Sequence, residues 1–326
     1  MKKLLLATSA LVMTSGFAAA EITLSGSARM GLLYNGEDVN FTSRVRIQFT
    51  ASGESDTGLA FGFSVRADQA NAAQDGMGAG SLFVSGAFGK LSMGDVVGAA
   101  EAAVGDLNGV GLTGLGDFSD TVFITGDGVE VSTDNPVLLY EYSAGGFTGY
   151  LSANDGNLLG GDLFGGGASA GSDDQAIAVG VKYATGAYTF GLGYENVNPA
   201  AVGPDLTHIV ASAAGTFGTT TVKAVFGVGD GGLIDDFEQY GISASSTFGA
   251  TTVTGFYKRV DTGAVDGEID AIGLGAAYDL GGGASVVGGI VNYDVGAGAL
   301  PVGPVGGVGT DPSGETVADL GLNFTF

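Results

Sequence analysis

The last stretch of the chain, residues 316–326, reads TVADLGLNFTF and decides the fold class. Every second residue from Ala318 to Phe326 is apolar, and each residue between them is polar or glycine. This alternation predicts a β-strand with one apolar and one polar face. A chain that ends inside a strand predicts that this strand pairs on both sides. A closed barrel in a lipid bilayer requires such pairing, because an unpaired backbone group is very costly there.

Residues 1–20 are typical of a secretory signal peptide. Two lysines precede an apolar run from Leu4 to Met13, and Ala18–Ala20 supplies the small residues of a cleavage site. The apolar run is too short for an anchor helix that spans a bilayer. We therefore expect cleavage and a mature chain that starts at Glu21. No later apolar run reaches the length of a transmembrane helix, so a membrane role would have to use strands.

The composition agrees with an exported β-protein. Removing Lys2 and Lys3 leaves 9 basic residues against 35 acidic ones, so the mature chain has a formal charge of −26. This acidity argues against a nucleic-acid partner and invites divalent cations. The absence of cysteine excludes disulfides and thiol chemistry. A chain with 62 glycines and 45% hydrophobic residues is too apolar for a disordered linker and is poor helix material.

The mature chain divides into sixteen alternating segments separated by turn signals. An even number of strands brings both ends of the mature chain to the same side, as an up-and-down barrel needs. The predicted strands are 22–34, 41–52, 58–68, 80–88, 90–95, 136–144, 147–155, 174–185, 187–196, 206–217, 219–229, 237–248, 250–260, 269–280, 283–294 and 316–326.

The connections alternate in length and give the barrel two different ends. On one side they are tight and glycine-bearing, and four of these turns recur every 31 to 32 residues: Gly186, Gly218, Gly249 and Gly281. On the other side they are long and acidic. Aromatic residues precede several turn glycines, which indicates an interfacial girdle; these are Phe88, Phe217 and Phe248, with Phe326 at the same level. The alternative is the core of a β-sandwich, but a sandwich of this length would more readily form two domains.

A closed sheet of sixteen strands encloses more space than side chains can fill, and such barrels leave an aqueous channel. The third long connection, residues 96–135, is far longer than a hairpin needs. It carries seven acidic residues and no lysine or arginine. Folded inward, it would narrow the channel.

Four arginines fall on the polar face of the first three strands. Pairing across the intervening turns places Arg29 beside Arg46 and Arg44 beside Arg66. Like charges gathered on neighbouring strands cost stability without a purpose, so we interpret them as a basic patch on the lumen wall. A basic wall that faces an acidic loop creates a transverse field that acts on solutes in transit.

Other motifs carry little weight. His208 is the only histidine. We expect it at the mouth of the lumen and not in a catalytic or metal site. The GxGxxG match at residues 109–114 lies in the long loop without a strand-to-helix context and is a chance match. Acidic loops, including Asp173–Asp174 and Asp235–Asp236, could bind Ca²⁺, but no EF-hand or nonapeptide spacing is present and no ligands can be named.

The chain resembles the Gram-negative general diffusion porins of the purple-bacterial (alphaproteobacterial) type. The resemblance covers almost the whole mature chain. It is carried by LSGSARMGLLYNGEDVNFTSRVRIQFTASG (24–53), GAFGKLSMGD (86–95), EAAVGDL (101–107), DNPVLLYEYSAG (134–145), STFGATTVTGFY (246–257), LGGGASVVGGI (280–290) and VADLGLNFTF (317–326).

The resemblance implies a homotrimer of 16-stranded barrels whose third loop constricts the pore. By motif position, the basic wall would be Arg29, Arg44, Arg46 and Arg66, and Glu101 and Asp106 would lie on the acidic loop. Asp117 and Asp120 fall in a part of the loop that matches the family poorly and are added as acidic candidates. The first and last strands would close the barrel with Glu21 and Phe326 close together. Loops four to eight depart from the family pattern.

The sequence thus predicts an all-β protein: a transmembrane antiparallel 16-stranded up-and-down β-barrel with a long third loop folded into the lumen. We expect a non-enzymatic pore in the outer membrane of a Gram-negative bacterium, in contact with lipid and lipopolysaccharide, that passes small hydrophilic solutes and ions by passive diffusion. Residues 1–20 form the signal peptide, 21–326 the barrel and 96–135 the constriction loop. The alternatives are a substrate-selective outer-membrane channel and a secreted Ca²⁺-binding structural β-protein.

Overall fold

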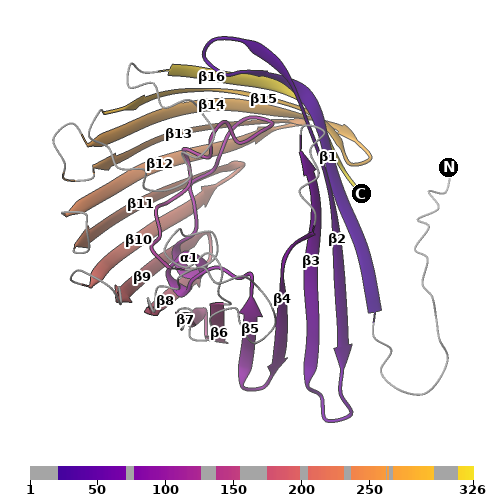
Figure 1. Cartoon of the computed structure of the whole chain (residues 1–326), viewed down its shortest axis with the longest axis vertical. Coiled ribbons are helices and arrows are strands. Elements are labelled where there is room, and N and C mark those ends of the chain that lie inside the picture. Colours follow the sequence, from indigo (N-terminus) through magenta and orange to yellow (C-terminus); the bar gives the residue numbers. More distant parts are fainter. Residues whose placement is uncertain are drawn as a thin grey trace, which may run out of the picture.

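The computed structural model describes residues 21–70, 77–125, 137–154, 175–198, 205–230, 236–261, 263, 267–296 and 315–326. The predicted signal peptide therefore lies outside the described residues. Within them the chain forms sixteen strands and one short helix, and the strands close into an antiparallel barrel in which each strand pairs with its sequence neighbours. Figure 1 looks down this barrel, with the helix α1 inside the ring of strands. None of the described helices is long and apolar enough to cross a membrane.

The prediction of sixteen strands and of a closed barrel is confirmed, and every strand end lies within three residues of its predicted position. The strands are β1 (Glu21–Tyr34), β2 (Val39–Glu54), β3 (Ala60–Ala70), β4 (Met77–Gly86), β5 (Gly89–Gly94), β6 (Val137–Ala144), β7 (Phe147–Asn154), β8 (Gln175–Thr185), β9 (Tyr188–Asn198), β10 (Leu206–Phe217), β11 (Thr220–Asp230), β12 (Phe237–Phe248), β13 (Thr251–Asp261), β14 (Glu268–Gly281), β15 (Ala284–Val295) and β16 (Glu315–Thr325), with the helix α1 (Ala99–Val104) between β5 and β6.

The barrel closes where β1 pairs with β16. Leu32 lies opposite Leu320 and Ala28 lies opposite Phe324, and the backbones of Gly26 and Phe326 exchange two hydrogen bonds. Glu21 lies five residues farther along β1, where its partner is Ser52 of β2. Phe326 thus takes part in closure as expected, but it meets Gly26 and not Glu21, because β1 extends past the end of β16.

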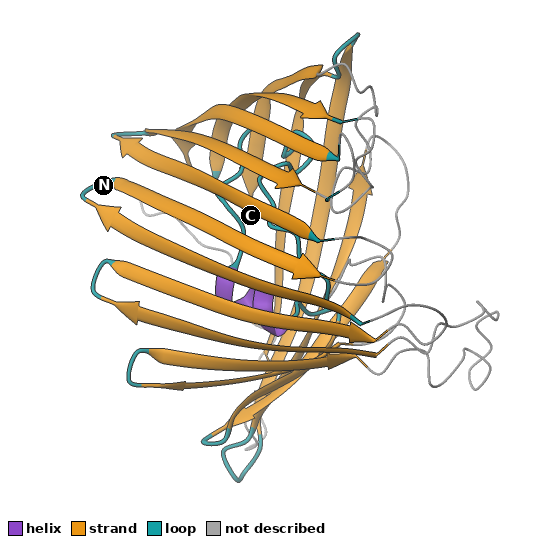
Figure 2. Ribbon diagram, turned by 90° about the vertical axis from the view of Figure 1, so that its left-hand side faces the viewer, coloured by secondary structure: helices purple, strands orange, loops and turns teal. Residues whose placement is uncertain are grey.

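The short turns gather at one end of the barrel (Figure 2). Gly186, Gly218 and Gly249 have φ angles of 57°, 64° and 63°, a left-handed conformation that explains why glycine recurs at these turns. Next to these turns, Phe88, Phe217, Phe248 and Phe326 are all exposed on the outer surface. They lie where the sequence places an aromatic girdle.

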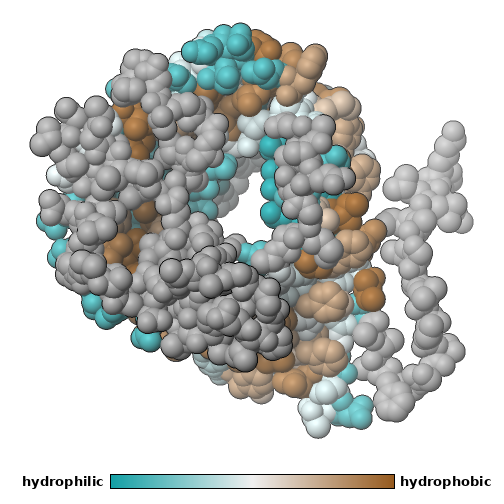
Figure 3. Space-filling model, in the orientation of Figure 1, coloured by the Kyte–Doolittle hydropathy of each residue, from teal (hydrophilic) through white to brown (hydrophobic). Residues whose placement is uncertain are grey.

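The outer surface is apolar along the strands. Exposed side chains on the first two strands include Ile22, Leu24, Phe41 and Ile47, with Phe41 91% exposed. Figure 3 shows hydrophobic residues on the outside of the barrel and an opening through its middle that hydrophilic residues border in part. This arrangement is the reverse of a water-soluble globule and fits a lipid-facing exterior around a wet lumen.

The buried core lies inside the lumen, between the long loop and the wall. The inward face is polar on β2 and β3, as the predicted alternation requires, but it is apolar on much of β8–β16, where the inward residues Phe256, Val291 and Tyr293 are at most 5% exposed. They are covered by apolar residues of the loop, including Val110, Leu115 and Phe118, which belong to the same cluster. The wall is apolar there because the loop, and not water, is its neighbour.

Candidate functional site

The described part of the long loop, residues 96–125, lies inside the barrel against the wall (Figures 1 and 2). It begins with α1, which packs on β7, β8 and β9. The chain then reaches β16 and β1 at Leu112 and Thr113, and it returns to β9 at Thr125. The loop is therefore seated along one side of the lumen, and the prediction that it folds inward is confirmed.

Three glycines allow α1 to approach the wall. A Cβ atom built on Gly180 would lie 2.2 Å from the carbonyl oxygen of Ala99, and one on Gly191 would lie 2.4 Å from that of Ala103. A Cβ on Gly193 would lie 2.6 Å from the Cβ of Ala100. Any larger side chain at these positions would push the helix into the lumen.

Polar wall residues fix both ends of α1. The Ser152 hydroxyl accepts a hydrogen bond from the backbone N–H of Ala99 (2.9 Å) at the first turn. At the other end, the Lys223 ammonium and the Ser212 hydroxyl both donate to the carbonyl of Val104, at 2.7 Å and 3.1 Å. These contacts satisfy backbone groups that a helix end leaves unpaired, and the lysine charge complements the helix C-terminus.

Two carboxylates of the wall hold the rest of the loop in the same manner. On β16, the Asp319 carboxylate accepts from the N–H groups of Leu112 (2.9 Å) and Thr113 (2.6 Å) and from the Thr113 hydroxyl (2.8 Å). On β9, the Glu195 carboxylate accepts from the N–H groups of Ile124 and Thr125 and from the Thr125 hydroxyl. Each carboxylate thus binds a dipeptide made of an aliphatic residue followed by threonine.

Further contacts lie between these two anchors. The Lys258 ammonium donates to the carbonyl of Asp120, and the Ser243 hydroxyl accepts from the N–H of Asn108 at 3.0 Å. The rings of Phe118 and Tyr293 stack with centroids 4.4 Å apart. The loop is therefore attached to the wall at points spread along its whole described length.

The four predicted arginines share the inner face of β1–β3, as expected, but their pairing is shifted. Arg29 lies directly opposite Arg44, whereas Arg46 lies opposite Asp68 and Arg66 opposite Gln48. The predicted pairs, Arg29 with Arg46 and Arg44 with Arg66, are therefore wrong. The first turn is centred one residue earlier than assumed and the second two residues later, which moves the register by two and four residues while each side chain keeps its face.

Asp68 was not singled out from the sequence and lies among these arginines. Its carboxylate is 2.8 Å from Nε of Arg46 and 3.0 Å from Nε of Arg66. It offsets part of the like-charge repulsion, and the group stays net positive. Arg29 reaches the loop, where its guanidinium donates to the carbonyl of Leu112 at 3.0 Å.

The four predicted acidic residues, Glu101, Asp106, Asp117 and Asp120, all lie on the described part of the loop. Glu101 lies on α1, and the Asp106 carboxylate accepts from the N–H of Thr121 at 2.8 Å, which ties the two arms of the loop together. Asp117 has a left-handed φ of 53°. The remaining acidic residues of the loop, Asp127, Glu130 and Asp134, lie outside the described residues.

The pKa values of Asp117 and Asp120 report the charges around the loop. Desolvation raises the pKa of Asp117, while the charges of Arg29 and Arg44 act in the opposite direction. Desolvation and the charges of Asp106 and Asp117 raise the pKa of Asp120 to about 7, against the influence of Lys258. The carboxyl groups of Asp106, Asp117 and Asp120 therefore lie close enough to repel one another. Asp117 is also attracted by the arginines of the wall.

Sequence reasoning missed the residues that anchor the loop, above all Asp319, Glu195 and Gln239. Each is a polar residue at an inward position, and this parity was the available signal. His208 was expected at the lumen mouth; it is instead fully buried between Glu195 and Gln239 beneath the loop, so that expectation is wrong. The GxGxxG segment is the loop tip, and its Gly111 backbone approaches Asp319.

A closed sixteen-stranded barrel with an apolar exterior, an open lumen and a loop seated inside it defines a β-barrel membrane channel. Comparisons with known proteins agree. The family model described as Gram-negative porin matches residues 7–298, and the chain belongs to this family. It is 42% identical over 329 residues to the porin of Rhodobacter capsulatus, covering 94% of this chain and all of that protein.

Solved structures give the same result. A porin structure refined at 1.8 Å resolution matches with a TM-score of 0.77 and 40% identity, over 94% of this chain and all of that one. A substituted form of the Rh. blastica porin matches at 24% identity with a TM-score of 0.66, again over 94% of this chain and all of that one, which shows likeness of fold alone. The chain is thus a general diffusion porin of the Gram-negative outer membrane and not an enzyme.

Proposed function

We propose that solutes crossing this porin pass an eyelet between the loop and the arginine wall (Arg29, Arg44, Arg46 and Arg66). The acidic edge of this eyelet is formed by Asp117 and Asp120, with Asp106 behind them and Glu101 on α1. The observation that carries the proposal is that the loop lies inside the barrel (Figure 1) beside the arginine wall, where Arg29 donates to the carbonyl of Leu112 at 3.0 Å. In this position the charges of Arg29 and Arg44 act on the carboxyl group of Asp117. Opposite charges on the two sides create a transverse field that favours polar solutes over apolar ones.

The arginine wall is tested by replacing Arg44 and Arg46 together with alanine. Loss of two positive charges from the eyelet should shift the reversal potential in a KCl gradient toward cations and raise the single-channel conductance. The matched control is Ser245→Ala on β12, whose hydroxyl bonds Thr254 of the wall and not the loop. A double variant with unchanged conductance and selectivity would place the constriction elsewhere.

A substrate-selective channel is the rival within transport. Its flux would saturate with solute concentration, whereas diffusion through a field-lined eyelet gives flux that rises linearly. Liposome swelling with a series of sugars and amino acids separates the two, because a selective channel would favour one solute far beyond its size.

We further propose that the chain acts as a homotrimer, which is typical of the porin family and is supported here by membership of that family. Conductance steps that close in groups of three, together with a heat-modifiable oligomer on gels, are the expected results. Isolated single steps from a monomeric band would contradict this proposal.

Three further proposals concern export and the exterior. Removal of residues 1–20 is supported by the cleavage pattern and is tested by N-terminal sequencing of the purified protein, with Glu21 expected first. Lipopolysaccharide contact is supported by membership of the Gram-negative porin family and is tested by co-purification. Ca²⁺ binding by acidic loops is supported by the charge of −26 and is tested by calorimetry; the described residues hold no group of three potential metal ligands, and Asp173–Asp174 lies outside them.

A further inference from the structure

We propose that Glu195, His208 and Gln239 act as one positioning unit for residues 121–125, the return arm of the loop. The unit would hold the acidic edge at a fixed distance from the arginine wall. It deepens the eyelet proposed above and rests on it for its effect on solutes. All three side chains are 0% exposed, so none of them touches a solute in transit, and any effect on the pore must act through the loop.

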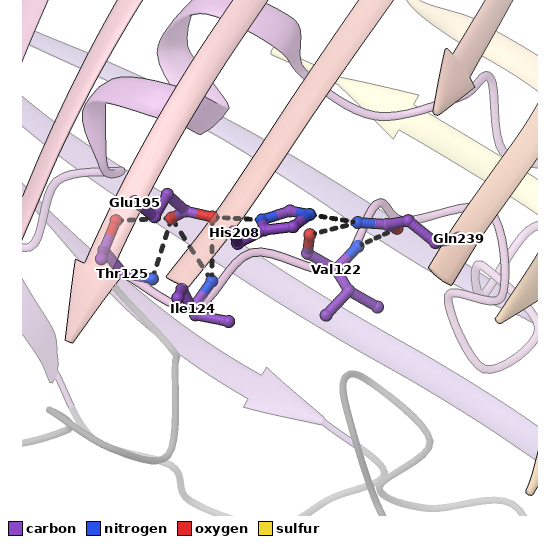
Figure 4. A network of polar contacts seen from close by, with 6 residues as sticks. All are labelled: Val122, Ile124, Thr125, Glu195, His208 and Gln239. Atoms are coloured by element: carbon purple, nitrogen blue, oxygen red, sulfur yellow. Dashed lines mark hydrogen bonds and ion pairs between the residues drawn. The ribbon is translucent and has the colours of Figure 1, made fainter. Parts of the chain in front are cut away.

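The loop atoms that contact the Glu195 carboxylate are all hydrogen-bond donors. The N–H and the hydroxyl of Thr125 lie 3.0 Å and 2.6 Å from its Oε1, and the N–H of Ile124 lies 3.2 Å from its Oε2. The same Oε2 is 2.6 Å from Nδ1 of His208 (Figure 4). An ionised carboxylate can only accept hydrogen bonds, and the donors around Glu195 supply them. Nδ1 of His208 must therefore carry a proton, which it donates to Glu195.

The backbone of Val122 sets the other end of the unit. The side-chain oxygen of Gln239 accepts from the N–H of Val122 at 2.8 Å, and its amide nitrogen donates to the carbonyl of Val122 at 2.7 Å. Rotating this amide by half a turn would place donor against donor and acceptor against acceptor. The amide nitrogen also lies 3.1 Å from Nε2 of His208, so Nε2 must accept. His208 is therefore uncharged and in a single tautomer, and the hydrogen bonds run in one direction from Val122 to Glu195.

A glycine on the intervening strand makes the unit possible. His208 lies on β10 and Gln239 on β12, so β11 runs between them. A Cβ atom on Gly227 of β11 would lie 2.6 Å from Nε2 of His208 and 3.0 Å from the amide nitrogen of Gln239. The two side chains meet only because this position carries no side chain, and Phe237 covers His208 with ring centroids 5.0 Å apart.

The return arm depends on this unit because its backbone groups are bound there. The N–H groups of Val122, Ile124 and Thr125 and the carbonyl of Val122 all bond to Glu195 or Gln239. Asp120 directly precedes the arm, and the Thr121 N–H bonds Asp106. A displaced arm would carry both aspartates with it.

The experiment uses three single variants of the full protein: Glu195→Gln, Gln239→Leu and Gly227→Ala. Glu195→Gln places an amide N–H against donors, and Gly227→Ala inserts a methyl group between His208 and Gln239. Because the natural chain has no cysteine, spin labels can be attached at Thr50→Cys on the wall and Asp117→Cys on the loop. The controls are Gly255→Ala, where an added Cβ has its nearest contact at 3.4 Å, and Ser245→Ala.

We expect each variant to broaden the label-to-label distance distribution, since loss of a buried hydrogen-bond partner shifts a local equilibrium by about tenfold or more. The controls should match the parent protein. The effects of Glu195→Gln and Gln239→Leu should not add when the two are combined, because His208 couples the two side chains. Narrow, parental distances in all three variants would overturn the proposal, as would fully additive effects of the pair.

Parallel single-channel recordings separate this proposal from the eyelet itself. Broadened distances with raised open-channel noise and a shifted reversal potential support both. Broadened distances with parental conductance and selectivity support the positioning unit and count against the eyelet. If Gly227→Ala fails to fold, Thr125→Val removes only the hydroxyl bond to Glu195 and should broaden the distances to a smaller extent; a parental distribution in that variant also counts against the unit.

Discussion

Asp319 and Arg29, on the two strands that close the barrel, bind the two backbone groups of the same loop residue. The Asp319 carboxylate accepts from the N–H of Leu112, and the Arg29 guanidinium donates to its carbonyl. The loop tip is therefore fastened across the β1–β16 seam, where the first and last strands of the barrel meet. Barrel closure and loop position are linked through these two side chains.

Asp319→Asn should loosen the loop tip. The substitution keeps the shape of the side chain but places an amide N–H against the backbone donors of Leu112 and Thr113. Loss of a buried hydrogen-bond partner of this kind costs about 1–3 kcal/mol. Hydrogen exchange of peptides covering residues 110–116 measures the effect, with Ser285→Ala on the neighbouring strand as the control. Parental protection of the tip would show that Asp319 is not its anchor.

Asp68→Asn should shift ion selectivity toward anions, opposite to the Arg44 and Arg46 substitutions. The aspartate offsets the charges of Arg46 and Arg66, and its neutralisation leaves the wall more positive. The effect should be largest at low ionic strength, since salt screens charges exposed to the lumen. Reversal potentials measured at two salt concentrations test this, and a shift toward cations would contradict it.

Cation preference should rise with pH through the neutral range. The pKa of Asp120 is raised to about 7, so this carboxyl is mostly protonated and neutral at pH 6 and mostly ionised at pH 8. The added negative charge at pH 8 favours cations in the eyelet. Reversal potentials recorded from pH 6 to pH 8 measure the change. Asp120→Asn should flatten this part of the profile, and a variant that keeps the full pH dependence would assign it to another group.

Gly180→Val should displace α1 while the barrel still closes. The new side chain would overlap the backbone of Ala99, and overpacking of this kind costs about 1–3 kcal/mol. Faster hydrogen exchange over residues 99–104 is the expected result. Gly149→Val is the control, because a Cβ added there meets nothing within 4 Å. Equal exchange in the two variants would mean that the position of α1 does not depend on the absence of a side chain at Gly180.

The sequence predicted the barrel because its determinants are local. Alternation with a period of two assigns each strand and each face, as in the stretch from Ala318 to Phe326. Turn glycines such as Gly186 and Gly218 mark the ends. The four arginines were placed on the inner face by parity alone, which does not change when the pairing register moves by an even number of residues.

The partners across strands and the seat of the loop were decided by the tertiary structure. Arg29 faces Arg44 because turn geometry sets the register, and a shift of one residue in the centre of a turn moves every pair by two. His208 could not be placed from its own strand, since the β9–β10 register sets its partner Glu195 and its other partner, Gln239 of β12, meets it only over Gly227. Local pattern determines which way a side chain points in this protein, whereas long-range packing inside the lumen determines what it meets, because the loop that covers the wall is separated from it by up to 207 residues of chain.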